Sequence, residues 1–308
     1  MGDGDPRKEL HQFAVPPPWV PFPSNLGLPP FQMKTVLGYD QPNLSGVSDS
    51  YRMGSVISAC DVVAVRSCAE LESEWLDLLR ELYHKPVLPI GLLPPLAPVS
   101  GEDDSWIPIL EWLDKQEKAS VVYVALGSEA TPREDELTEL ALGLELSGLP
   151  FFWALRKRHD SVELPDGFED RTKDRGVVWR TWAPQLRILG HESVGGFVTH
   201  CGLSSVVEGL NFGRALIMFP LWGDQGIIAK SFQEMKVGIE IPRDEEEGWF
   251  SSKSVAQTLS LVMVEEEGRI YREKAKELSK LFGDKDLQQR YINDFVEYLQ
   301  NHRRNRKD

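Results

Sequence analysis

Residues 196–205 read GFVTHCGLSS, and this stretch decides the fold class. Its first four residues form an apolar run typical of a buried strand, a glycine turn follows, and two serines open a helical pattern that continues through Leu210. A buried strand that passes through a turn into a helix is the βα unit of a parallel sheet. Ligands of such sheets bind at the carboxyl ends of the strands. The stretch therefore predicts an α/β fold with a ligand site near His200.

Strands and helices alternate on both sides of this stretch. The continuous apolar run 120–125 predicts a strand, and the helix expected over 133–146 carries four apolar residues at i, i+3, i+4 and i+7 spacing. These four are Leu137, Leu140, Ala141 and Leu144. The other expected strands are 151–155, 177–179 and 215–219, and the other expected helices are 253–264, 271–281 and 287–300. This alternation predicts βαβ units and a parallel sheet.

The first ninety residues contain fewer regular elements. The run 15–23, VPPPWVPFP, excludes a helix or an interior strand. This run lies at the centre of residues 1–33, which are rich in proline and glycine, and we expect it to form a loop over the protein surface, with a polyproline ligand as the alternative. A strand over 61–65, a helix over 71–83 and a strand over 86–90 are expected to follow. The helix should bury one apolar face, which consists of Leu71, Trp75, Leu78, Leu79 and Leu82.

A change of composition divides the chain. Residues 91–101 are rich in proline, and the acidic run Glu102-Asp103-Asp104 follows them. We therefore expect four parts. They are a first segment at 1–90, a linker at 91–107, a sheet domain at 108–285, and a C-terminal helix and tail at 286–308.

Composition and charge restrict the class of function. The chain has 308 residues, of which 41% are hydrophobic and 27% are charged, and this is the balance of a globular protein. The net charge of −14 argues against nucleic acid or an anionic membrane as the main partner, because both need a basic face. Three cysteines are too few for a disulfide framework, and no apolar stretch is long enough to span a membrane. With no recognisable signal sequence, a cytoplasmic protein with reduced thiols is expected.

The turn at 200–205 offers hydrogen-bond donors for an anion. Backbone N–H groups and the positive end of the helix dipole would face a bound phosphate. Gly202 lets the backbone approach the ligand, and His200, Ser204 and Ser205 can donate hydrogen bonds. An acidic protein can hold a diphosphate in this way without a basic patch. The alternative is that the serines only cap the helix, and the turn alone does not decide between the two.

Other motifs fail in the same region. The segment 202–206, GLSSV, lacks the last glycine of the hydrolase elbow, and 191–195, HESVG, lacks the second histidine of a zinc helix. The chain contains no GxGxxG motif, no P-loop and no CxxC pair. Dinucleotide, ATP and zinc chemistry are therefore unsupported, and we expect neither a metal ion nor a cofactor.

Residues 182–225 resemble the signature box of plant family-1 UDP-glycosyltransferases. The resemblance rests on many residue types at fixed spacing, which are Trp182-Ala183-Pro184-Gln185, Leu189, His191, Gly195, Phe197, Thr199-His200-Cys201-Gly202, Ser205, Glu208, Gly213, Pro220, Trp222 and Asp224-Gln225. It extends over nearly the whole chain. The phrases PPWVPF at 17–22, RSCAELE at 66–72 and VMVEEEG at 262–268 resemble the glycoside-extending, rhamnosyltransferase-like branch.

The resemblance implies a UDP-sugar site. Trp182 would stack on the uracil, Glu208 would accept the ribose hydroxyls, and His200 with Ser205 would hold the diphosphate. The alternatives are a buried core tryptophan and a solvated helix glutamate. The full set of implied UDP-binding residues is Ser128, Trp182, Ala183, Gln185, His200, Gly202, Leu203, Ser204, Ser205 and Glu208, and the implied sugar-binding residues are Trp222, Asp224 and Gln225.

Three positions depart from the family pattern, and the mildest is Ala215, which stands where the family usually has proline at a strand start. Leu203 stands where the family usually has tryptophan, and Ser204 stands where it usually has asparagine. The leucine alters packing near the nucleoside. The serine shortens a side chain that would donate to the phosphates, although the glycoside-extending branch often carries serine there.

The family fold is the GT-B arrangement, in which two doubly wound domains face each other across a cleft. The resemblance implies a complete C-terminal Rossmann-like domain with a parallel sheet and only the end of the N-terminal domain. A histidine oriented by an aspartate acts as the family's general base. The phrases that carry this pair have no counterpart here, so no catalytic residue is assigned.

The activity implied is metal-independent, inverting transfer of a sugar from a UDP-sugar to a hydroxyl of a small plant metabolite or its glycoside, such as a flavonoid or terpenoid glycoside. Gln225 favours glucose as the donor sugar, whereas the branch favours rhamnose. Two alternatives are an inactive UDP-sugar-binding fragment and an α/β interaction domain.

Overall fold

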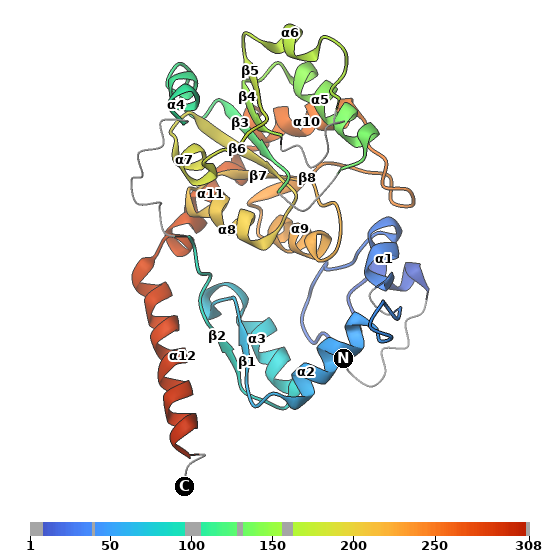
Figure 1. The fold of residues 1–308 in the computed structure, drawn as a ribbon, viewed down its shortest axis with the longest axis vertical. Helices are drawn as coiled ribbons and strands as arrows, with labels where there is room; N and C mark the ends of the chain where they lie inside the picture. The colour runs from blue at the N-terminus through green and yellow to red at the C-terminus, as the bar shows by residue number, and fades with distance from the viewer. Residues whose placement is uncertain (1–8, 39–40, 96–105, 128–131, 156–162, 306–308) are drawn as a thin grey trace.

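The computed structural model describes residues 9–38, 41–95, 106–127, 132–155 and 163–305, and these residues form two parallel sheets (Figure 1). The larger sheet has six strands in the order β5-β4-β3-β6-β7-β8. Its strands are β3 (Val121–Ala125), β4 (Phe151–Ala154), β5 (Gly176–Trp179), β6 (Val194–Thr199), β7 (Ala215–Met218) and β8 (Gly238–Glu240). All neighbouring strands pair in parallel, which confirms the predicted α/β fold with a Rossmann-like sheet.

Helices cover both faces of the large sheet. Successive residues of a strand point to opposite faces, and in these strands both sets of residues are apolar. On one face Val122 and Val124 lie in a core with side chains from α5 and α10, and on the other face Tyr123 and Phe197 lie in a core with α7, α8 and α11. The helices of this region are α4 (Ile107–Leu113), α5 (Glu134–Ser147), α6 (Phe168–Thr172), α7 (Gln185–Gly190), α8 (Leu203–Asn211), α9 (Gln225–Glu234), α10 (Ser252–Met263) and α11 (Arg269–Phe282). This doubly wound arrangement brings the carboxyl ends of the strands to one edge, where the turn at 200–205 lies.

The strand β8 has no counterpart among the expected strands, because it is only three residues long and begins with a glycine. A Cβ atom on Gly238 would lie 2.1 Å from the carbonyl oxygen of Leu216. The close pairing of β8 with β7 therefore needs glycine at this position. The other expected strands, and the helices over 133–146, 253–264 and 271–281, are confirmed with small shifts of their ends.

The smaller sheet pairs β1 (Val63–Val65) with β2 (Val87–Pro89), and α3 (Ala69–Tyr83) connects them. These three elements are confirmed, but the predicted apolar face of α3 is partly wrong. Leu76 is buried instead of Leu82, which is 39% exposed. Leu82 lies in the last turn of α3, which ends at Tyr83, whereas Leu76 lies in the middle of the helix.

Two helices flank the proline-rich run 15–23, and neither is among the elements expected from the sequence. The proline-rich run 15–23 is irregular as predicted, but a 3-10 helix, η1 (Leu10–Ala14), precedes it and α1 (Pro30–Leu37) follows it. Proline is well suited to the first position of a helix, which is where Pro30 lies. A further helix, α2 (Asp49–Ala59), begins after Ser48, whose side chain accepts a hydrogen bond from the backbone N–H of Tyr51.

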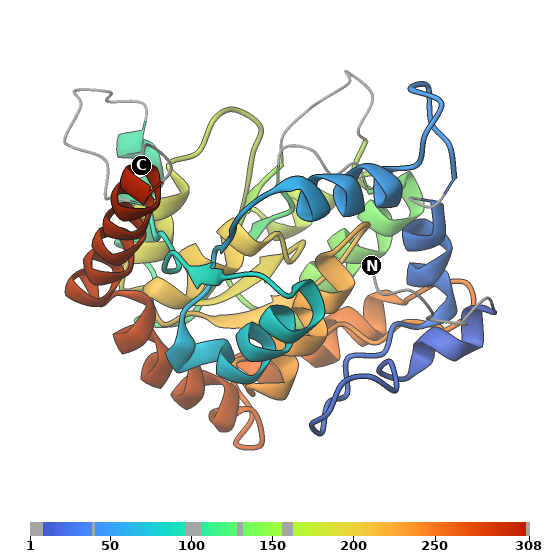
Figure 2. The ribbon, with the colours of Figure 1, turned by 90° about the horizontal axis from the view of Figure 1, so that it is seen from below.

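We call the described residues up to 95 the front segment and those from 106 to 284 the sheet region. The front segment lies on the side of the large sheet that carries α8 and α9 (Figures 1 and 2). Leu28 and Met33 are buried, and the side-chain amide of Gln32 donates to Glu240 Oε1 at 3.2 Å. The last helix, α12 (Lys285–Asn305), extends past the expected 287–300 and also contacts the front segment. No helix among the described residues is long and apolar enough to cross a membrane.

Candidate functional site

The predicted phosphate turn lies at the carboxyl edge of the large sheet, between the end of β6 and the start of α8. Cys201 has a left-handed backbone, with φ of 66°, and this bend directs the chain from strand to helix. The ring of His200 packs against two glycines. A Cβ atom on Gly127 would lie 2.7 Å from Cε1 of that ring, and one on Gly202 would lie 2.5 Å from Nε2. Both glycines are therefore needed for the His200 ring to sit at the ends of β3 and β6.

The N-terminus of α8 carries no side-chain cap from its N-cap residue, which is Gly202. The serines lie inside the first turn of the helix, where Ser204 is exposed and Ser205 is half-buried. The alternative that these serines form the N-cap is therefore wrong. An uncapped first turn presents backbone N–H groups and the positive end of the helix dipole to its surroundings.

Glu208 and Gln185 are joined by a hydrogen bond between α7 and α8. The amide Nε2 of Gln185 donates to Glu208 Oε2 at 2.5 Å. The hydroxyl of Tyr123, on β3, donates to Oε1 of the same Gln185 at 3.2 Å. Sequence reasoning misses Tyr123, because it lies inside an apolar strand and only the polar tip of its ring distinguishes it. These two hydrogen bonds connect the three side chains and fix the position of the Glu208 carboxylate.

Trp182 lies in the loop before α7 with its side chain 59% exposed. The alternative of a buried core tryptophan is therefore wrong. Its carbonyl oxygen accepts a hydrogen bond from the indole N–H of Trp179 at 3.1 Å, and the next residue, Ala183, is buried. The backbone of the loop is thus anchored while the Trp182 indole remains accessible.

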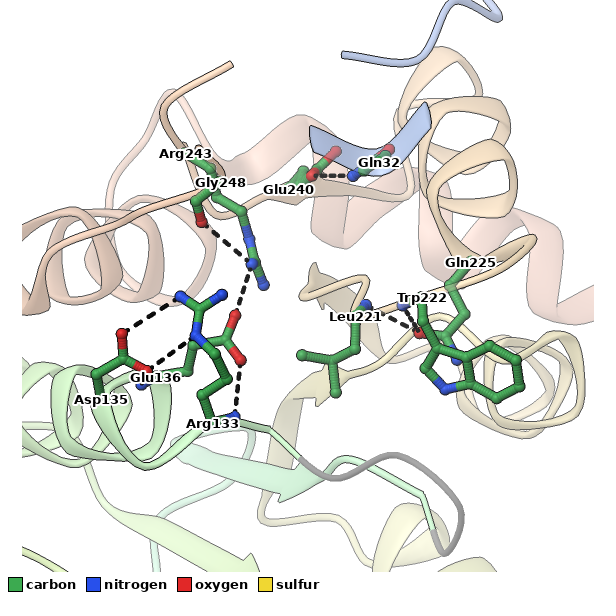
Figure 3. Close-up of polar contacts among 10 residues, drawn as sticks. All are labelled: Gln32, Arg133, Asp135, Glu136, Leu221, Trp222, Gln225, Glu240, Arg243 and Gly248. Atoms are coloured by element: carbon green, nitrogen blue, oxygen red, sulfur yellow. Dashed lines mark hydrogen bonds and ion pairs between the residues drawn. The ribbon is translucent and has the colours of Figure 1, made fainter. Parts of the chain in front are cut away.

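The predicted sugar-binding residues lie at the start of α9 (Figure 3). Gln225 is only 5% exposed, and its Oε1 accepts hydrogen bonds from the backbone N–H groups of Leu221 at 2.9 Å and Trp222 at 3.2 Å. Its amide group therefore closes the loop before α9, and Nε2 is the group left for another partner. Trp222 and Asp224 are exposed beside it. Ser128, the last predicted site residue, lies outside the described residues.

A buried charged cluster lies across from the Trp222 loop (Figure 3). The Arg243 side chain is 5% exposed, pairs with Glu136 Oε1 at 3.1 Å, and lies over the rings of Phe219 and Phe250. Burial lowers the pKa of Arg243 and raises that of Glu240, although Lys230 and Arg243 act in the opposite direction on Glu240. The cluster ties α5 to the end of β8.

One further cation reaches the first turn of α8. Nη1 of Arg66, the residue after β1, donates to Ser204 Oγ at 2.8 Å. Burial lowers the pKa of Arg66, whereas the charge of Glu208 raises it. Sequence reasoning uses Arg66 only as part of a family phrase, because its separation of 138 positions from Ser204 leaves no local signal of their contact.

The fold is that of a doubly wound α/β protein, and an uncapped helix N-terminus lies at the carboxyl ends of its strands. Residues 101–306 match the family model described as UDP-glucoronosyl and UDP-glucosyl transferase. The chain therefore belongs to the UDP-glycosyltransferase family.

Curated relatives support this assignment along the chain. It is 50% identical to UDP-glycosyltransferase 91D2 of Stevia rebaudiana, over 99% of this chain and 65% of that protein. It is 44% identical to soyasaponin III rhamnosyltransferase of Glycine max, over 97% of this chain and 66% of that protein. The chain thus spans about two thirds of the length of the curated relatives it matches.

Solved structures agree on the fold. UGT2 of Phytolacca americana, complexed with UDP-2fluoro-glucose and pterostilbene, is 30% identical with a TM-score of 0.71 over 82% of this chain and 58% of that one. UDP-glucose: anthocyanidin 3-O-glucosyltransferase in complex with UDP is 33% identical with a TM-score of 0.70, over 81% of this chain and 55% of that one. The GT-B assignment and the branch expected from the sequence are therefore confirmed.

Proposed function

We propose that this protein transfers a sugar from a UDP-sugar to a hydroxyl of a small plant metabolite or its glycoside, with inversion and without a metal ion. The observation that carries the proposal is one edge of the sheet that holds an exposed indole at Trp182, a carboxylate at Glu208 and the uncapped first turn of α8. These groups match the three parts of UDP in order, which are a flat base, a ribose diol and a diphosphate.

The residues would act by binding and by stabilising charge. The uracil would stack on Trp182 beside Ala183, and the ribose hydroxyls would donate to Glu208, which Gln185 orients. The diphosphate would face Ser128, His200, Gly202, Leu203, Ser204 and Ser205. When the bond from the anomeric carbon to the phosphate oxygen breaks, negative charge grows on UDP. Donors at a helix N-terminus, already fixed before the reaction, stabilise that charge.

The donor sugar would lie against the start of α9. Asp224 can accept hydrogen bonds from sugar hydroxyls, Gln225 Nε2 can donate one, and the exposed indole of Trp222 can cover an apolar sugar face. Relatives include a rhamnosyltransferase and structures with glucose donors, so UDP-glucose and UDP-rhamnose are the two donors to compare. We propose a flavonoid or terpenoid glycoside as the acceptor, consistent with the anthocyanidin and the soyasaponin in the names of two relatives.

Calorimetry with UDP and dUDP tests the proposal. The chain should bind UDP more tightly than dUDP, because dUDP lacks one hydroxyl for Glu208. Hydrogen bonds to charged groups contribute about 1.5–3 kcal/mol. Glu208→Ala should therefore lower the affinity for UDP by about tenfold or more, and it should reduce the preference of the protein for UDP over dUDP. Glu192→Ala, at an exposed glutamate away from this edge, is the control. No UDP binding at millimolar concentration would refute the proposal, and equal losses for both nucleotides would refute the role of Glu208.

The alternative is a protein that binds UDP-sugar without transferring it. The observation that favours it is that no described residue of the chain is assigned as general base, a group whose loss typically removes about 10²–10⁴-fold in rate. Both functions predict UDP binding, so they differ only in turnover. Assaying the 308-residue chain with both donors and a panel of flavonoid and terpenoid glycosides separates them. Robust product formation supports transfer, whereas tight UDP binding without product supports the alternative.

A further inference from the structure

Arg66 connects the front segment to the proposed diphosphate site. It follows β1 directly, and its guanidinium makes three hydrogen bonds. Nε donates to the carbonyl of Leu92 at 2.7 Å, Nη2 donates to the carbonyl of Leu93 at 3.3 Å, and Nη1 donates to Ser204 Oγ at 2.8 Å. Two contacts hold the guanidinium to its own segment, and the third reaches across to the first turn of α8.

The position of this charge is unusual for electrostatic reasons. The N-terminus of a helix carries partial positive charge, so a cation there is unfavourable and an anion is favourable. The negative charge of Glu208, one turn further along α8, raises the pKa of Arg66, but Oε2 of Glu208 already accepts a hydrogen bond from Gln185. A cation held at a positive helix end in this way becomes favourable when an anion binds between them.

The hydrogen-bonding capacity of Arg66 also exceeds its described contacts. A guanidinium has five N–H donors, and the three bonds above use three of them. Ser204 Oγ accepts from Arg66, so its own hydroxyl hydrogen is directed elsewhere and can donate to a ligand. Arg66 and Ser204 therefore present donors from two elements that belong to different parts of the chain.

We propose that Arg66 binds the diphosphate of the nucleotide donor directly, so that the front segment completes a site otherwise built by the sheet region. This inference rests on the function proposed above, because it assigns one more residue to the same site. Ser204 stands where the family usually has asparagine, and Arg66 supplies donors next to this shorter side chain. During transfer the guanidinium would stabilise the negative charge that develops on the departing UDP.

The test compares UDP with uridine, which lacks the diphosphate. In the full chain, Arg66→Gln should raise the Kd for UDP by about tenfold or more at low salt, since this is the scale of a hydrogen bond to a charged group. The affinity for uridine, measured by NMR titration, should not change. The wild-type affinity for UDP should fall as salt is added, and Arg66→Gln should flatten that dependence, because one fixed charge is gone. A purely structural role for Arg66 would change neither the UDP-to-uridine ratio nor the salt dependence.

Two further variants control for folding and for charge. Arg80→Gln is matched, because Arg80 also lies in the front segment and donates from Nε to a strand carbonyl, that of Val87 at 3.1 Å, away from α8. It should leave UDP binding unchanged. Arg66→Lys keeps the charge but not the fork of donors, so it should keep the salt dependence and lose part of the affinity. This variant carries the test if the thermal midpoint shows that Arg66→Gln does not fold.

The outcomes separate this inference from the proposed function. Wild-type chain that does not bind UDP refutes the proposed function and this inference together. Wild-type chain that binds UDP, with Arg66→Gln weakening UDP and uridine equally or not at all, refutes only the role of Arg66. Arg66→Lys that binds UDP with wild-type affinity and with no salt dependence would also refute only the role of Arg66. Selective loss of UDP affinity with a flattened salt dependence supports it.

Discussion

The sheet region and the front segment cover their apolar side chains to different extents. Every residue of β3 is buried, and helices on both faces complete the core around it. In the front segment, by contrast, α2 buries no residue, and Tyr51, Met53 and Val56 are each more than 60% exposed. From this comparison we infer that the sheet region contributes most of the free energy of unfolding. The front segment keeps its place through contacts with that region and with α12.

The largest difference should appear when one apolar side chain is shortened to alanine in each region. Phe197 on β6 is fully buried and stacks on Tyr123 with ring centroids 5.2 Å apart. Phe197→Ala should lower the free energy of unfolding by about 3–5 kcal/mol, because it leaves a cavity. Met53→Ala on α2 should change it by no more than about 0.5 kcal/mol. Urea unfolding of both variants measures this, and similar losses would contradict the comparison.

Removing the hydrogen bond between α12 and the front segment should make the front segment more accessible to protease, without the same effect on the sheet region. Gln288 is buried, and its Oε1 accepts a hydrogen bond from the backbone N–H of Leu92 at 2.6 Å. Gln288→Ala leaves this N–H without its partner, at a cost of about 1–3 kcal/mol. Limited proteolysis should then cut the front segment and residues 91–107 sooner, while the sheet region resists.

The exposed Gln289, which bonds to Asn293 on the same helix, supplies the control variant Gln289→Ala. Selective digestion would support the division that we propose, with parts at 1–90, 91–107, 108–285 and 286–308. If both regions are digested at the same rate in Gln288→Ala, the division is wrong.

Within the sheet region, binding and stability should depend on different residues. Trp182→Ala should weaken UDP binding by about 1–3 kcal/mol, the usual contribution of stacking on an aromatic ring. Since the indole is exposed, the free energy of unfolding should change by no more than about 0.5 kcal/mol. Trp249→Ala, at a tryptophan of similar exposure, is the matched control for calorimetry and thermal unfolding. UDP binding that is equal in both variants would contradict the stacking role.

The smallest effect concerns the contact of the front segment with β8. Burial raises the pKa of Glu240 above its ordinary value of 4.5. The folded state therefore binds the proton more tightly than the unfolded state, and this contribution to stability is lost as the pH rises through the folded pKa. Glu240→Gln should raise the thermal midpoint at pH 7 to 8, and the gain should shrink as the pH falls towards 4.5.

The exposed Glu247 gives the control variant Glu247→Gln for this pH series. Gln32 can still donate to the amide oxygen of a glutamine at position 240, so this contact is preserved. A thermal midpoint that falls at pH 7 would show that the attraction of Lys230 and Arg243 for the Glu240 charge outweighs its burial.

The strands of the sheet were predictable because each is a local apolar run, and apolar runs show their period within a few residues. The misses have physical reasons as well. β8 is too short to show a period, and α1 begins at a proline next to a proline-rich loop. Both elements contact residues that are distant in the sequence, as Gly238 approaches Leu216 and Gln32 donates to Glu240.

The sequence by itself determined the α/β class, five of the six strands of the large sheet, and the box from 182 to 225 that identifies the family, because these are written in local patterns and fixed spacings. Only the tertiary structure decided that Trp182 is exposed, that Gln225 closes its own loop, and that Tyr123, Gln185 and Glu208 form one chain of hydrogen bonds. It alone brought Arg66 to Ser204. Such contacts join residues far apart in sequence, so they arise from the packing of whole elements and leave no periodic signal in the chain.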